Sequence, residues 1–99
     1  MALMEITIIP LGLGTPSIGD YLADIERALD KTEFPYRLTD MGTIVEGPTD
    51  QLLALAGRLH ALPFDKGVKR VDTRIIIDDR RDKVVHLDDK VKSVEARLR

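Results

Sequence analysis

The sequence predicts an α+β fold of the ferredoxin-like βαββαβ type: a four-stranded antiparallel sheet with two helices on one face, plus a C-terminal helix. Three observations support this. Four segments rich in β-branched residues alternate with two segments of helical spacing. A single glycine joins the second and third strand segments. The chain of 99 residues, 43% of them hydrophobic, suffices for one core, so we expect one domain over residues 1–99.

The first strand is expected from Leu3 to Leu11, where isoleucines favour extended backbone. Pro10 is expected to end its ladder, because proline has no N–H to donate. A glycine loop follows. Ser17 is then the expected N-cap of a helix from Ile18 to Lys31, whose apolar residues repeat at helical spacing.

The second and third strands are expected at Tyr36–Met41 and Thr43–Gly47, and their close junction at Gly42 predicts a hairpin. A second helix opens at Pro48 and Thr49, because proline is favoured in the first turn. Leucines and an alanine then recur on one face of this helix.

A turn-rich link is expected over Pro63–Lys69, followed by a fourth strand from Arg70 to Asp79. Apolar residues between Leu87 and Leu98 then recur at heptad-like spacing and predict a terminal helix. This order places the first and third strands at the centre of the sheet and the second and fourth at its edges.

Apolar residues are expected on both faces of this sheet. Ile9 and Ile76 fall on the opposite face from Ile8 and Ile75, so the face without the two helices should also be covered. The terminal helix and a partner subunit are the expected covers. A homo-oligomer is therefore predicted.

Composition narrows the class of function. A net charge of −2 and a pI near 5.6 argue against a nucleic-acid binder, since no basic surplus neutralises phosphates. The absence of cysteine excludes disulfides and thiol catalysis. No apolar run approaches the roughly 20 residues of a membrane span. The first residues lack a basic signal-peptide region, so we expect a cytoplasmic protein without membrane contact.

Familiar catalytic and metal motifs are lacking. The loop around Gly12 and Gly14 precedes a helix but has no P-loop lysine. His60 and His86 are far apart and lack acidic partners at metal-ligand spacing. The pair Asp78-Asp79 is flanked by arginines, which indicates an ion-pair cluster at a strand end.

Glu46 is the most unusual residue, because its strand contains no lysine or arginine to neutralise it. One interpretation is structural, with Glu46 paired to Arg74 or to a neighbouring subunit. The other is a bound cation, with the hydroxyl of Thr43 beside the carboxylate. The two interpretations are about equally supported by the residues alone.

These segments resemble a known family. The stretch Met41-Gly42-Thr43-Ile44-Val45-Glu46-Gly47, followed by Lys69-Arg70-Val71 and Ile75-Ile76-Ile77-Asp78-Asp79-Arg80, is similar to the small thiamine-binding protein family of the YkoF-like superfamily. The similarity covers nearly the whole chain. Asp40 departs from the pattern, where the family has proline, and adds a second acid beside the hairpin.

The resemblance implies a ferredoxin-like thiamine-binding domain, assembly of dimers into a tetramer, and binding of thiamine or a related hydroxymethylpyrimidine without catalysis. Thiamine is then a bound ligand, and no cofactor or metal is expected. A carboxylate complements the cationic thiazolium, an aromatic ring adds a cation–π contact, and hydroxyls orient the rings. The candidate ligand-binding residues are Glu46, Thr43, Thr7, Thr15, Ser17, Tyr36 and Asp40.

Two alternatives to a thiamine carrier, buffer or sensor stay open. One is an enzyme that acts on a small phosphate ester, by analogy with other domains of this fold. The other is a structural or regulatory oligomer in which Thr43 and Glu46 belong to an interface.

Overall fold

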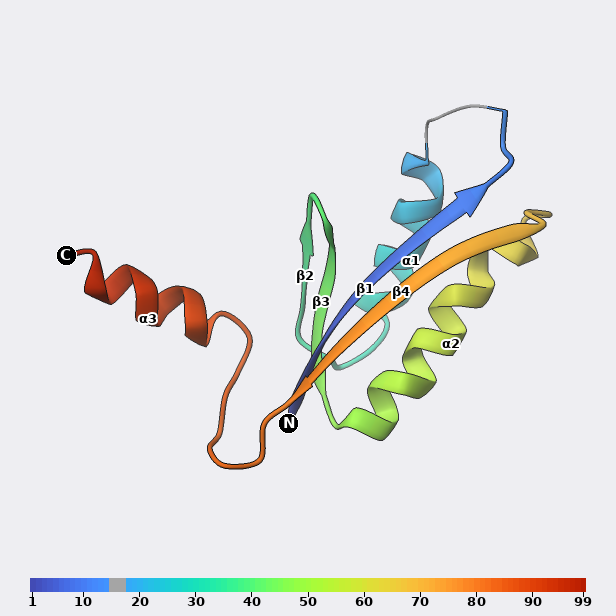
Figure 1. Cartoon of the computed structure of the whole chain (residues 1–99). Coiled ribbons are helices and arrows are strands. Elements are labelled where there is room, and N and C mark those ends of the chain that lie inside the picture. The colour runs from blue at the N-terminus through green and yellow to red at the C-terminus, as the bar shows by residue number, and fades with distance from the viewer. Residues whose placement is uncertain (15–17) are drawn as a thin grey trace.

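The computed structural model describes residues 1–14 and 18–99. Its four strands form one antiparallel sheet in the order β2-β3-β1-β4, so the first and third strands are central as predicted. Helices α1 and α2 lie on one face of this sheet (Figure 1). The predicted fold class and order of elements are confirmed. The elements are β1 (Ala2–Leu11), α1 (Gly19–Asp30), β2 (Tyr36–Thr39), β3 (Gly42–Gly47), α2 (Thr49–Asp65), β4 (Arg70–Asp79) and α3 (Asp89–Arg97).

The core lies between the sheet and the two helices. Alternate residues of β1 from Ala2 to Pro10 are buried, because successive side chains of a strand point to opposite faces. Leucines at helical spacing on α1 and α2 meet them. Burial of each such side chain stabilises the fold by roughly 1.5–3 kcal/mol. The largest fully buried side chains are those of Met4, Leu29, Val45, Leu52, Leu55, Leu59 and Pro63.

Two prolines behave differently from the prediction. Pro10 does not end the ladder, since β1 stays paired with β4 through Leu11. It lies beyond the end of the pairing with β3, where that edge of β1 is free and a missing N–H interrupts nothing. Pro63 does not begin the link, because α2 continues to Asp65. Only the last helical turn loses a hydrogen bond there, and the buried proline ring packs in the core.

The start of α1 is shifted slightly from the prediction. The helix begins at Gly19, and Ile18 occupies the N-cap position without a side-chain hydrogen bond. The predicted cap, Ser17, lies outside the described residues.

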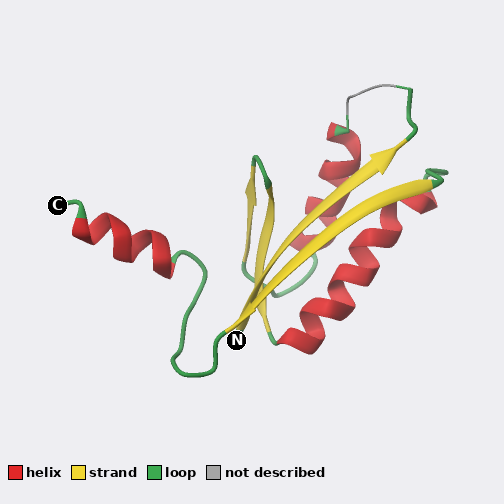
Figure 2. Ribbon diagram, in the orientation of Figure 1, coloured by secondary structure: helices red, strands yellow, loops and turns green. Residues whose placement is uncertain are grey.

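The second face of the sheet is open in this chain. The register pairs Ile9 with Asp72 and Ile76 with Glu5, on the face opposite the core residues Ile6 and Ile8. The predicted two-faced apolar pattern is therefore confirmed. The terminal helix does not cover this face: α3 contains no buried residue and projects away from the sheet at the end of a long loop (Figure 2).

Strand β1 pairs unequally with its neighbours. It is paired with β4 from Ala2 to Leu11, but with β3 only from Ala2 to Ile6. The β2–β3 hairpin is correspondingly shorter than the β1–β4 pair (Figure 1). One edge of β1 is thus free from Thr7 onward. Within the described residues, no helix is long and apolar enough to cross a bilayer.

The hairpin turn packs directly against this free edge. Gly42 has a φ of 153°, a backbone conformation that residues with a side chain rarely adopt. A Cβ atom there would lie 2.7 Å from Thr7 Oγ1 and 3.1 Å from the carbonyl oxygen of Ile6. The close approach of hairpin and β1 therefore requires glycine at this position.

We expect Gly42→Ala to lower the free energy of unfolding by roughly 1–3 kcal/mol, because it combines backbone strain with a clash against β1. Gly57→Ala is the matched control. Gly57 lies in α2 with open space around its Cβ position, and alanine there should stabilise the helix by about 0.5–1 kcal/mol. Urea unfolding of both variants measures these changes in the free energy of unfolding. Equal stability of the two variants would contradict the packing described.

Candidate functional site

A cavity of about 220 Å³ lies at the free edge of β1, between the β2–β3 hairpin and the first turns of α1. Isoleucine and leucine side chains from these elements form most of its wall. A cavity of about 150 Å³ suffices for benzene in an engineered protein, so this one accommodates a single substituted six-membered ring. Four of the lining residues carry side-chain oxygen atoms: Thr7, Thr39, Asp40 and Thr43. Strand pairing places Thr43 on the helix-covered face with Ile6, whereas Thr7 points to the opposite face at the free edge of β1.

Three of the predicted ligand-binding residues, Thr7, Asp40 and Thr43, are thus brought together around one cavity. They come from β1, the hairpin turn and β3, and they reach the cavity from different sides, because Thr7 and Thr43 point to opposite faces of the sheet. Thr43 is buried, whereas Asp40 is exposed at the turn. An apolar cavity with a few convergent polar groups is the usual form of a small-molecule site.

The three threonine hydroxyls of the cavity are each held by a hydrogen bond within the chain. Thr7 donates to the carbonyl oxygen of Met41 at 3.0 Å. Thr39 donates to the carbonyl oxygen of Gly42 at 2.7 Å and accepts from the Met41 N–H at 3.2 Å. These bonds fix the hairpin turn against β1 and orient the hydroxyl groups.

The hydroxyl of Thr43 donates to Glu26 Oε1 on α1 at 2.9 Å. The second carboxylate oxygen of Glu26 is buried and has no hydrogen-bond partner in the described part of the chain. Glu26 was not among the predicted residues. The signal was available, because Glu26 stands four residues after Leu22 and next to Ile25, inside the apolar stripe of the helix.

The other predicted residues lie elsewhere. Tyr36 does not line the cavity: its phenol donates to Asp30, and this hydrogen bond raises the pKa of Tyr36 to about 12. Thr15 and Ser17 lie outside the described residues.

Glu46 lies on the opposite face of the sheet from Thr43. The two residues are three positions apart on one strand, and an odd separation places side chains on opposite faces. The expectation that Thr43 lies beside Glu46 is therefore wrong. The role of Glu46 as charge partner of a ligand remains a prediction.

The carboxylate of Glu46 holds the segment that leads to α3. One oxygen accepts the backbone N–H of Leu87 at 2.6 Å, and the other is 3.3 Å from His86 Nδ1. These contacts leave Glu46 only 5% exposed. The suggested pair with Arg74 is not formed, because Arg74 contacts Asp72 at 3.4 Å instead.

A second cavity, of about 310 Å³, lies under the same segment, between it and the open face of the sheet. Met1, Leu3 and Ile44 line it on the sheet side. Val85 and Leu87 line it from the segment, and Val91 lines it from the first turn of α3. Glu46 is not among its lining residues. One wall of this cavity is the irregular connection between β4 and α3, whereas strands β1 and β3 and helix α1 contribute to the wall of the first cavity.

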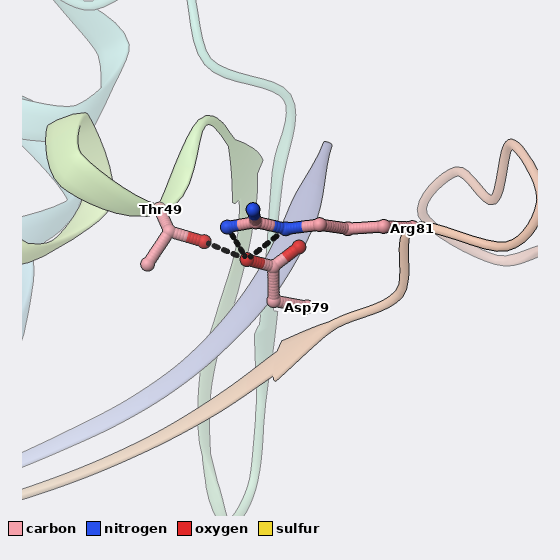
Figure 3. Close-up of polar contacts among 3 residues, drawn as sticks. All are labelled: Thr49, Asp79 and Arg81. Carbon is pink, nitrogen blue, oxygen red and sulfur yellow. Dashed lines mark hydrogen bonds and ion pairs between the residues drawn. The ribbon is translucent and has the colours of Figure 1, made fainter.

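The predicted ion-pair cluster at the end of β4 is formed in part, because Asp79 pairs with Arg81 whereas Arg80 pairs with Asp82 at 2.6 Å rather than with Asp78. Arg81 contacts Asp79 at 2.8 Å, and the hydroxyl of Thr49 donates to the same carboxylate oxygen at 2.9 Å (Figure 3). The hydrogen bonds from Arg81 and Thr49 lower the pKa of Asp79. This cluster connects the end of the sheet to the start of α2. Thr49, Asp79 and Arg81 also line a cavity of about 580 Å³ at this end of the sheet. Their polar groups are engaged with one another, which gives the cluster a structural role.

Fold and site together define a small α+β sandwich that has a ring-sized cavity at the edge of its central strand. The sequence model of the family described as thiamine-binding protein matches residues 4–95. The chain belongs to this family.

Three relatives illustrate the family resemblance. The chain is 43% identical to the UPF0045 protein YqgV of Bacillus subtilis over 102 aligned positions, which cover 99% of this chain and 98% of that one. The crystal structure of MJ1052 from Methanocaldococcus jannaschii superposes with a TM-score of 0.86 at 29% identity and covers 95% of each chain. TM0486 of Thermotoga maritima, whose name refers to thiamine biosynthesis and salvage, has a TM-score of 0.78 at 16% identity, with coverage of 94% and 97%, and so shares the fold alone.

We expect Glu46→Ala to release the segment before α3. The Leu87 amide would lose its acceptor, and hydrogen exchange at that amide should become roughly tenfold to a hundredfold faster, as for loss of a bond worth about 1.5–3 kcal/mol. Glu33→Ala, which removes an exposed carboxylate from the loop after α1, is the control. Unchanged exchange at Leu87 in Glu46→Ala would contradict this role.

Proposed function

We propose that the protein binds thiamine, or the hydroxymethylpyrimidine portion of thiamine, in the cavity at the edge of β1, without turnover. It would serve as a cytoplasmic carrier, buffer or sensor. The observation that carries this proposal is the convergence of Thr7, Asp40 and Thr43 around a ring-sized cavity, in a chain of the thiamine-binding protein family.

The size of the cavity favours the pyrimidine ring as the buried part of the ligand. Apolar walls from β1 and α1 would contact both faces of the ring, and the hydroxyls would meet its polar edge. The thiazolium would then extend toward the hairpin turn and Asp40. Because Asp40 is exposed, its attraction for the cation at about 4 Å is of order 1 kcal/mol.

Calorimetric titration with thiamine, thiamine phosphates and free hydroxymethylpyrimidine tests the proposal. We expect thiamine and the pyrimidine to bind, and Asp40→Asn to weaken thiamine about fivefold, which corresponds to roughly 1 kcal/mol, without changing the affinity for the neutral pyrimidine. Asp65→Asn, an exposed charge at the end of α2, is the control.

Absence of binding by both compounds would contradict the proposal. Release of phosphate from thiamine phosphates under the same conditions would favour the alternative of an enzyme acting on a small phosphate ester.

We also propose that the protein assembles as a homo-tetramer, a dimer of dimers, with β4 and α3 at the contacts. The support is an unpartnered apolar surface. Val91 and Val94 on α3 are 48% and 50% exposed, and Ile76 on the edge strand β4 is 63% exposed. An unpaired edge strand with apolar residues favours pairing with another chain.

Val91→Asp combined with Val94→Asp should dissociate the assembly, because two charges would enter an apolar contact. Ala96→Asp is the control, since it adds one negative charge to the opposite side of α3. Light scattering coupled to size-exclusion chromatography gives the mass of each. A wild-type protein that is monomeric at micromolar concentration would contradict the proposed assembly.

A further inference from the structure

We propose that the hydroxyl of Thr43 offers the cavity at β1 a hydrogen-bond acceptor and no donor, so that the cavity selects a ring with an exocyclic amine over one with a carbonyl at the same position. This inference rests on the proposed function and deepens it. It assigns the direction of the hydrogen bonds, and with it the chemical class of ring that fits.

The polarity of the cavity depends on which threonine hydroxyls still have a proton to donate to a ligand. A threonine hydroxyl has one proton to donate and two lone pairs to accept. The hydroxyl protons of Thr7 and Thr39 are directed to the carbonyl oxygens of Met41 and Gly42, and strand pairing places both side chains on the face opposite Thr43. The threonine hydroxyl on the helix-covered side of the cavity is therefore that of Thr43.

The Thr43 hydroxyl also uses its proton within the chain, in its hydrogen bond to Glu26. A carboxylate can only accept, so the proton of the Thr43 hydroxyl lies on the 2.9 Å contact with Glu26 Oε1. The lone pairs of Thr43 remain for the cavity, which Thr43 lines and Glu26 does not. Glu26 is thus a positioning residue that sets the polarity of Thr43.

The charge of Glu26 makes the Thr43 oxygen a stronger hydrogen-bond acceptor. Its second oxygen is buried without a partner, and no ion pair to Glu26 is formed within residues 1–14 and 18–99. A hydrogen bond to an ionised group polarises the hydroxyl that donates it, which makes the oxygen a better acceptor. Asp40, at the rim of the cavity, adds a further acceptor and a second negative charge.

The ring that fits such a wall carries a donor. The aminopyrimidine of thiamine has an exocyclic amine, which can donate an N–H to a lone pair of the Thr43 hydroxyl. Oxythiamine is the same molecule with a carbonyl oxygen in place of that amine. Its lone pairs would face those of the wall, and the buried groups on both sides would lose their hydrogen bonds.

The experiment compares the affinities of thiamine and oxythiamine by calorimetry for the full chain. The wild-type protein should prefer thiamine by roughly tenfold to a hundredfold, the range expected for unpaired buried polar groups. Glu26→Gln should reduce this preference to about threefold or less. The glutamine amide can donate to Thr43, which frees the threonine proton for the carbonyl of oxythiamine.

Glu33→Gln, the same substitution at an exposed position, should keep the wild-type preference. Equal affinity of the wild-type protein for the two compounds would overturn the inference without any variant. A full preference in Glu26→Gln, with an unchanged melting temperature, would also overturn it. Failure of both compounds to bind would instead overturn the proposed function on which the inference rests.

Discussion

The unequal pairing of β1 is the constraint on which the rest of the structure depends. Its neighbour β4 accompanies it over its whole length, whereas β3 leaves after Ile6. The remaining edge of β1 cannot be closed by a third strand, so the hairpin turn and the start of α1 lie beside it and leave a cavity between them. Thr7 and Gly42 hold the hairpin turn at that edge. The same free edge tolerates Pro10.

The alternation of side chains along β3 separates two kinds of surface. Thr43 points to the helix-covered face and joins the cavity through its contact with Glu26. Glu46 points to the open face and holds the backbone of the segment before α3. Ligand binding and assembly are therefore assigned to opposite faces of one short strand. A substitution on one face should leave the other largely unaffected, because the sheet itself lies between them.

Much of this fold follows from the sequence. The β-branched segments and helical stripes predict every element in its order, since burial requires those periods. The gathering of Thr7, Asp40 and Thr43 follows from the hairpin at Gly42. The continuation of α2 through Pro63 does not, because packing of a buried proline outweighs its local preference.

The candidate site is less predictable, since it depends on how separate elements pack. Glu26 meets Thr43 only because α1 crosses β3 at that point, and His86 meets Glu46 only because the loop after β4 turns back over the sheet. The spacing of residues in the sequence does not determine where α1 crosses β3 or how the loop after β4 turns. The separation of Thr43 from Glu46 was predictable, however, because strand alternation alone places them on opposite faces.

The most direct test of the account is a map of the ligand's position by amide chemical shifts. In a titration of the labelled protein with thiamine, the largest changes should fall on the hairpin turn and the facing edge of β1, at Thr7, Gly42 and Thr43. Changes concentrated on Glu46 and Leu87, with the hairpin turn unaffected, would place the ligand on the open face and contradict the account.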